Sequence, residues 1–318
     1  MTDIRSQVLE RFMRYVAIDT QSSEESQTLP STPGQWNLIN LLKQELLDLG
    51  LADATANSSG VVTATLPANL GPGSIAPVVA FMAHVDTYHG TSGKDVKPQI
   101  LERYDGKDIL LAGSGEYLRV SENPELSAYV GQTVITSDGT TLLGADDKAG
   151  VAAIMTLLDH LIHHPEVKHG TLRVAFTPDE EIGKGTAGFP PLAEFGAHVA
   201  YTVDGGPEGE VENETFCADT AVVTLLGKDV HPGYAKGKMV NACRAAAYLV
   251  SLLPRENIPE TTDGKQGYLH PLSFTGDVNK VSVPFLVRDF EMDGLKRWEG
   301  VLEDMCRRTA AAFPGLRY

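Results

Sequence analysis

Acidic side chains and a histidine follow three apolar runs of the chain. His84 and Asp86 follow the run 78–83. Asp179, Glu180 and Glu181 follow the run 172–177, and Asp204 follows the run 199–203. A fourth group, Asp146 and Asp147, opens a stretch with helical spacing of apolar residues. Because α/β folds bind ligands at the carboxyl ends of their strands, we expect the four groups to converge at one sheet edge.

A crowd of carboxylates at one edge points to metal binding. Like charges repel strongly at short range unless cations neutralise them. Carboxylates together with a histidine suit zinc or another first-row divalent metal. Two metals that share a bridging carboxylate would explain why so many acidic groups are needed. The pattern therefore predicts a dinuclear metal site.

Each motif taken alone also has an ordinary explanation. A His-x-Asp triplet is common by chance, the pair Glu180–Glu181 is typical of a solvated turn, and Asp204 before two glycines is typical of a tight turn. The glycines around Asp146 could cradle a phosphate, but the chain has no GxxxxGK[ST] motif that would support nucleotide binding. The occurrence of all four groups at strand or helix ends favours the metal site.

The surrounding segments predict an α/β domain. Helices are expected over 8–16, 32–50 and 147–164, and strands over 61–66, 78–83, 134–135, 172–177 and 199–203. Thr32, Pro33 and Gln35 resemble a capping box with proline at the first helical position. The run 78–83 is apolar throughout, as in strands buried on both faces. Alternation of helices with such strands indicates an α/β fold.

A second domain is expected after Gly205–Gly206, where the pattern changes. Strands are predicted over 221–226, 272–278 and 281–290, and helices over 240–253 and 295–313. This β-α-β-β-α order fits a ferredoxin-like α+β domain that lacks its last strand, which would begin at 316–318. We place the two domains at 1–214 and 215–318.

Composition narrows the class of partner and the compartment. The 318 residues include 26 Lys and Arg against 42 Asp and Glu, a net charge of -16 that disfavours nucleic acid and anionic membrane surfaces. No apolar run approaches the roughly 18 residues needed to span a bilayer. The three cysteines are far apart and form no CxxC motif, which favours a reducing, cytoplasmic location.

Five stretches carry a resemblance to a known family: 30–36, 83–87, 141–150, 175–181 and 201–206. They resemble the peptidase T family, the cytoplasmic tripeptide aminopeptidases of the dinuclear-zinc aminoacylase and carboxypeptidase clan, and the resemblance extends from Leu9 to the last residue. It implies a zinc-peptidase catalytic domain with a mixed sheet flanked by helices, and a smaller ferredoxin-like lid domain.

The resemblance also implies a role for each residue of the candidate site. His84 and Asp204 would bind one zinc, Glu181 the other, and Asp146 would bridge the two. Asp86 would orient His84, as metal-bound imidazoles require. Glu180 would be the general base, taking a proton from a zinc-activated water and delivering it to the leaving amine. The Asp146–Asp147 peptide would be cis.

Three residues of the second domain match lid residues of the family. His231 would donate to the developing oxyanion, Asn241 would contact substrate, and Arg288 would clamp a peptide carboxylate with two hydrogen bonds. Their ordinary interpretation is as loop residues without a role in binding.

In one respect the chain departs from the family. Members carry a further segment after the lid, with a histidine that completes the second zinc site and a glycine-rich substrate loop, and no stretch here matches it. The histidines without a role are His89, His160, His163, His164, His169, His198 and His270. We therefore expect a chain that is shortened at its C-terminus. A complete site would hold two zinc ions, and in this chain the second zinc site would lack one ligand. The open edge of the lid sheet makes a homodimer possible.

The leading functional hypothesis is metal-dependent hydrolysis of the N-terminal residue from tripeptides, with short peptides as partners. Metal ligands do not encode the substrate, so a related dipeptidase or N-acyl amino-acid deacylase is an alternative. A third alternative is an inactive truncated binding protein that keeps part of the site.

Overall fold

The structure is a computed structural model that describes residues 3–71, 73–207 and 209–318. The chain divides into two compact units, and the division falls between Glu210 and Val211. The sequence places this boundary after residue 214. None of the helices in the described ranges is long and apolar enough to cross a membrane.

A five-stranded mixed sheet forms the centre of the first unit. Its strands, in spatial order, are β1 (Thr55–Ala56), β2 (Val62–Leu66), β8 (Leu172–Thr177), β3 (Val79–His84) and β9 (Val199–Thr202). β1, β2 and β8 pair antiparallel, whereas β8, β3 and β9 run parallel. The three parallel strands therefore end at the same edge.

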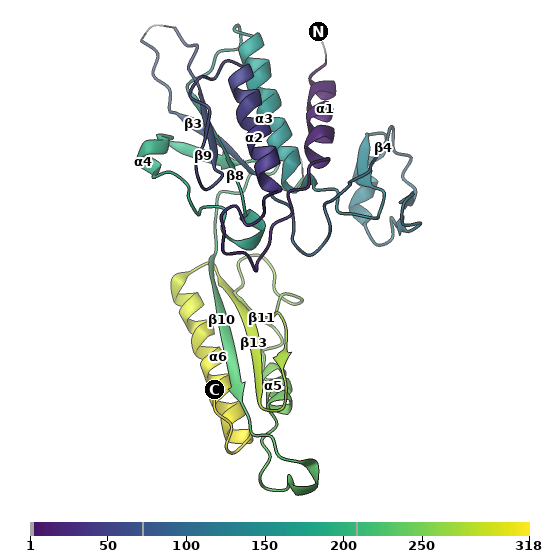
Figure 1. Cartoon of the computed structure of the whole chain (residues 1–318), viewed down its shortest axis with the longest axis vertical. Coiled ribbons are helices and arrows are strands. Elements are labelled where there is room, and N and C mark those ends of the chain that lie inside the picture. Colours follow the sequence, from purple (N-terminus) through teal and green to yellow (C-terminus); the bar gives the residue numbers. More distant parts are fainter. Residues whose placement is uncertain (1–2, 72, 208) are drawn as a thin grey trace. The chain divides into compact units, whose positions relative to one another are not determined.

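Three helices cover one face of this sheet: α1 (Ile4–Val16), α2 (Gln35–Asp48) and α3 (Ala145–His163) (Figure 1). Alternate strand residues such as Val174 and Phe176 pack into one core with Leu42 and Leu158 from the helices. The intervening residues face the other side, where a smaller cluster joins Ala175 of β8 to the short helix α4 (Leu192–Phe195). This period of two fixes which strand side chains support the helices.

A long excursion separates β3 from α3. It contains two small two-stranded antiparallel sheets and a 3₁₀ helix: β4 (Pro98–Leu101) with β7 (Val134–Ser137), β5 (Ile109–Leu110) with β6 (Tyr117–Leu118), and η1 (Pro124–Tyr129). The sequence predicted only a short strand at 134–135. Two-residue strands such as β5 and β6 are too short to produce a readable alternation of apolar and polar residues.

The predicted start of the second helix was wrong. α2 begins at Gln35, and its N-cap is Gly34, which offers no side-chain cap. Thr32 instead donates its hydroxyl to the carbonyl of Gln21, 2.7 Å away. Gln35 directs its amide to Asp179, 144 residues further along the chain. Long-range partners therefore replaced the local capping box.

The second unit has a four-stranded antiparallel sheet with two helices on one face. Its elements are β10 (Cys217–Leu226), η3 (Pro232–Tyr234), α5 (Ala242–Ser251), β11 (Tyr268–Pro271), β12 (Thr275–Gly276), β13 (Lys280–Asp289) and α6 (Met292–Ala312). The order is β10-β13-β11, with β12 also paired to β13. Residues at alternate positions of β13, from Val281 to Val287, pack against α5 and α6. Arg317 forms an antiparallel bridge with Leu226, beyond the outer edge of β10.

The predicted strand 272–278 is interrupted in the structure. β11 ends with Pro271 opposite Phe285, and pairing resumes with Thr275 opposite Ser282. Three residues on this side therefore face two on β13, which is the geometry of a β-bulge. The alternation of Leu272, Ser273, Phe274 and Thr275 looked like an ordinary strand and did not reveal this change of register.

Candidate metal centre

His84 lies at the centre of the edge where the parallel strands end. Its Nε2 is 2.9 Å from an Asp146 carboxylate oxygen, 3.7 Å from one of Asp204 and 3.9 Å from one of Glu180. These residues come from β3, the start of α3, the end of β9 and the turn after β8. The structure thus brings together residues up to 120 positions apart that the sequence assigned to one site.

The other nitrogen of His84 is held by Asp86. His84 Nδ1 is 3.1 Å from the Asp86 carbonyl oxygen and 3.3 Å from its carboxylate. The backbone N–H of His84 donates to Asp147, 3.1 Å away. With Nδ1 and the backbone fixed, Nε2 is the atom available to a metal. This is the arrangement by which a buried carboxylate sets the tautomer of a metal-binding histidine.

Asp86 also fixes the turn that follows β8. Its carboxylate accepts the backbone N–H of Glu180 at 2.9 Å and that of Glu181 at 3.2 Å. Asp86 is completely buried, so its geometry is set by these contacts and not by solvent. The turn, η2 (Glu180–Ile182), carries the predicted base and one predicted ligand.

Two sets of donor atoms lie close enough to hold a metal, each within 4.8 Å. One is His84, Asp147 and Asp204, and the other is His84, Asp146 and Glu181. Among the described residues, every group of three or more potential ligands includes His84. A histidine with several carboxylates fits a first-row divalent cation, so the residues present fit the predicted metals.

The charges of the site favour a cation. Burial, followed by the charge of Asp204, raises the pKa of Asp147 to about 8. Burial and the neighbouring acids Asp146 and Glu180 raise the pKa of Asp204 to about 6, although His84 opposes this. Burial lowers the pKa of His84, but the hydrogen bond and charge of Asp86 outweigh it and raise the pKa to about 10. A bound cation would relieve the repulsion that raises the carboxylate pKa values.

Asp147 is a site residue to which sequence reasoning gave no role. It is buried, it orients His84, and it belongs to one of the two donor sets. The doublet Asp146–Asp147 at the start of the helix pattern was the available signal. The peptide between the two residues is cis, as the resemblance implies.

Gly150 lets α3 approach the end of β9. A Cβ at this position would lie 1.9 Å from the carbonyl oxygen of Val203 and 2.3 Å from an Asp147 carboxylate oxygen. The carbonyl belongs to the backbone and cannot move aside as a flexible side chain would. Glycine is therefore required by the close approach of two segments that carry site residues.

We expect Gly150→Ala to destabilise the protein by about 1–3 kcal/mol, the usual cost of overpacking. It should also weaken metal binding, because Val203 immediately precedes Asp204. Urea unfolding and zinc titration would measure both effects. Gly300→Ala is a matched control: no atom lies within 4 Å of the added methyl, and alanine in a helix should stabilise by up to about 1 kcal/mol. Equal behaviour of the two variants would contradict the close-approach argument.

The three predicted lid residues lie in the second unit and have local contacts there. His231 caps η3, with its Nδ1 accepting the Gly233 N–H at 3.1 Å, and Asn241 caps α5 through the Arg244 N–H at 3.0 Å. Arg288 of β13 lies over the ring of Phe216, 5.5 Å from its centroid. Asn241 thus has a structural function that its sequence context did not suggest.

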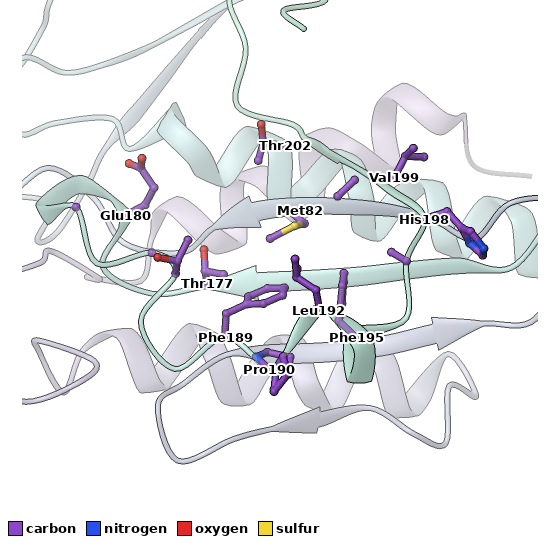
Figure 2. Close-up of a pocket in the computed structure, with 16 residues that line it drawn as sticks. Met82, Thr177, Glu180, Phe189, Pro190, Leu192, Phe195, His198, Val199 and Thr202 are labelled. Carbon is purple, nitrogen blue, oxygen red and sulfur yellow. The ribbon is translucent and has the colours of Figure 1, made fainter. Parts of the chain in front are cut away.

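An apolar cavity of about 780 Å³ lies along the sheet face covered by α4. Figure 2 shows Glu180 and Thr177 at one end and His198 at the other, with Met82, Leu192 and Phe195 between them. His198 is therefore distant from the acidic edge along the strands. It belongs to neither of the two donor sets.

Comparison with solved structures identifies the class of fold. The aminopeptidase PepT of Bacillus cereus ATCC 10987 matches with a TM-score of 0.67 at 22% identity, over 98% of this chain and 75% of that one. A dinuclear metal-binding peptidase of the M20 family from Bacillus subtilis matches with a TM-score of 0.56 at 13% identity, over 99% and 73%. The fold is that of the M20 peptidases, which confirms the predicted mixed-sheet fold class.

Sequence comparison identifies the family. The sequence model of peptidase family M20/M25/M40 matches residues 137–279. Peptidase T of Bacillus subtilis strain 168 is 52% identical over 297 residues, 92% of this chain and 71% of that protein. Peptidase T of Listeria monocytogenes serotype 4b is 50% identical over 289 residues, 91% and 70%. The chain belongs to the peptidase T family, which confirms the resemblance seen in its motifs.

Proposed function

We propose that the chain removes the N-terminal residue from tripeptides, with Glu180 as the general base. The observation that carries the proposal is the position of Glu180: its side chain is 54% exposed, yet its carboxylate lies 3.9 Å from His84 Nε2 at the centre of the candidate metal site. A base must reach both solvent and the reacting groups. The family relationship supports peptides as the substrate class.

For the metals we propose the ligands implied by the resemblance: His84 and Asp204 at one, Glu181 at the other, and Asp146 between them. The proximity of Asp146 to His84 supports this assignment, as does the donor set that joins Asp146 to Glu181. When bound, the two cations would polarise the scissile carbonyl and lower the pKa of water. Asp86 would orient His84 through Nδ1.

The proton transfers are assigned to Glu180. Its carboxylate would accept a proton from the attacking water and deliver it to the amine of the departing peptide. The backbone N–H of Glu180 is held by the buried carboxylate of Asp86, so the side chain begins from a fixed point. Such fixation keeps the base within reach of the reacting atoms.

Substrate contacts are proposed for the second unit. Arg288 would bind the peptide carboxylate, since a guanidinium matches a carboxylate with two parallel hydrogen bonds. His231 would donate to the developing oxyanion, and its Nδ1 contact with the Gly233 N–H leaves Nε2 for that purpose. Asn241 would contact substrate through its amide nitrogen, because its oxygen caps α5.

A panel of tripeptides, dipeptides and N-acyl amino acids, assayed with added zinc, tests the proposed activity. We expect tripeptides to be cleaved fastest, with release of the N-terminal residue. Preference for dipeptides or acylated amino acids would favour the related hydrolases. Binding of peptides without any cleavage would favour the inactive binding protein.

We also propose zinc as the metal, a cytoplasmic location and, as a prediction still to be tested, a homodimer. Zinc is supported by the donor types. The cytoplasm is supported by three free cysteines. Metal analysis, cell fractionation and light scattering would test these three statements separately.

A further inference from the structure

We infer that Asp179 is a positioning residue, which fixes the turn carrying Glu180 and Glu181 against the rest of the site. This inference rests on the proposed function, because Glu180 and Glu181 are its proposed base and metal ligand. Asp179 is completely buried and does not belong to either donor set. It therefore acts through its neighbours.

The carboxylate of Asp179 is held by three donors from a distant segment. One oxygen accepts the backbone N–H of Ser31 at 2.7 Å. The other accepts the side-chain amide of Gln35 at 2.7 Å and the hydroxyl of Ser31. Ser31 and Gln35 are themselves buried, so each of these groups would lose a partner in the absence of Asp179. A buried carboxylate that is satisfied in this way has one preferred position.

The backbone of Asp179 turns the chain into η2. Its φ is +60°, in the left-handed region, and its carbonyl accepts the N–H of Lys184 at 2.8 Å. The next two backbone N–H groups, of Glu180 and Glu181, point to Asp86. Two buried carboxylates therefore hold the turn: that of Asp179, which precedes it, and that of Asp86, which accepts its first two backbone N–H groups.

The segment that holds Asp179 is itself attached to the metal site. Ser22 N–H donates to the carbonyl of Thr87 at 3.1 Å, and Thr87 N–H donates to the carbonyl of Thr20 at 3.3 Å. Lys148, two residues after Asp146, donates to the carbonyl of Ile18 at 2.7 Å. Asp179 thus closes a network from η2 through residues 18–35 to the segments that carry Asp86 and Asp146.

Asp179→Asn isolates the contribution of the carboxylate. Asparagine keeps the size of the side chain and is tolerated in the left-handed region. Its oxygen can still accept the Ser31 N–H, but its nitrogen then faces the Gln35 amide nitrogen, so that Gln35 must rotate its amide and give up its contacts with Ser31 and Thr32. We expect zinc affinity to fall about 10-fold or more through Glu181, as when other groups behind metal ligands are removed. At saturating zinc, kcat should fall about 10–100-fold, because small displacements of catalytic groups are costly.

A second substitution, at position 35, exchanges the donor and the acceptor of the lost hydrogen bond. In Asp179→Asn/Gln35→Glu, the amide introduced at position 179 would donate to the carboxylate introduced at position 35. The hydroxyl of Ser31 lies 3.2 Å from the Gln35 amide in the native chain, and having lost its acceptor at position 179 it would be a further donor to that carboxylate. We expect this pair to recover a substantial part of zinc affinity and kcat, whereas Gln35→Glu alone should not improve either. Rescue of this kind would not follow from a general loss of stability.

Asp138→Asn provides the matched control. Asp138 is also a buried carboxylate of the first unit, but the hydrogen bonds that its side chain accepts come from Thr140 and not from η2. We expect it to lower the unfolding free energy without lowering zinc affinity or kcat. Zinc titration, steady-state kinetics on a tripeptide and urea unfolding would be measured for every variant.

The inference is overturned if Asp179→Asn matches the wild type in zinc affinity and kcat, if Asp138→Asn lowers both equally, or if the double variant shows no rescue. Should Asp179→Asn not fold, Ser31→Ala removes one donor and carries the same test with a smaller expected effect. A wild type that cleaves no tripeptide would contradict the proposed function. The zinc affinities of the variants would still decide whether Asp179 positions Glu181.

Discussion

Glu180→Gln is expected to retain its metal and to lose turnover by about 10²–10⁴-fold, the usual contribution of a general base. Glutamine preserves the shape of the side chain but cannot accept the proton of the attacking water. The Asp86 contact uses the backbone N–H of Glu180, so the turn should keep its position. Kinetics at saturating tripeptide, together with metal analysis of the same sample, would measure both properties.

Glu194→Gln is the control for this experiment. Glu194 is an exposed carboxylate of α4 and is not among the candidate site residues. Its loss changes the net charge by the same amount and should leave kcat unchanged. If Glu180→Gln kept a near wild-type rate, the assignment of the base would be wrong. If Glu180→Gln lost its metal together with its turnover, Glu180 would have to be treated as a metal ligand.

The acidic edge of the sheet could be predicted from the sequence because three of its four groups follow recognisable strands. The run 172–177 has the same bounds as β8, and the runs before His84 and Asp204 correspond to β3 and β9 within one residue. Parallel pairing then brings the residues that follow to one edge, whatever their separation in the chain. Residue type predicted metal binding by His84 and its acidic neighbours, whereas the role of each residue was implied only by the family resemblance.

The supporting residues could not be predicted in the same way. Asp179 depends on donors 144 and 148 residues away, and Gly150 depends on the approach of Val203. Neither relationship leaves a periodic pattern or a local motif. The doublet Asp146–Asp147 is visible in the sequence, but only the structure shows that Asp147 holds the backbone of His84.

The local sequence pattern also gave a wrong prediction for the start of α2, where tertiary contacts compete with helix capping. Thr32 and Gln35 have the spacing of a capping box, yet both side chains bind elsewhere. The energy of one cap is about 1 kcal/mol, which buried hydrogen bonds to a carboxylate can exceed. The hydrogen bonds around Asp179 therefore stabilise these side chains more than a local helix cap would.

Asp146→Ala is expected to lose both metal and activity. Asp146 lies 2.9 Å from His84 Nε2 and shares a donor set with Glu181, and it is the proposed bridge between the two cations. Without its charge the cations would face each other with less neutralisation, so their affinity should fall by more than the roughly 10–100-fold typical of a supporting residue.

The exposure of Asp146 makes this experiment decisive. Its side chain is 71% exposed, so truncation should remove little packing, and the unfolding free energy of the metal-free protein should change by less than about 0.5 kcal/mol. Metal content after dialysis would be compared with that of Glu166→Ala, which removes an exposed carboxylate beyond the other end of α3. Full metal content in Asp146→Ala would exclude a bridging role. Loss of metal there, with retention in Glu180→Gln, would separate the residue that binds the cations from the residue that moves the proton.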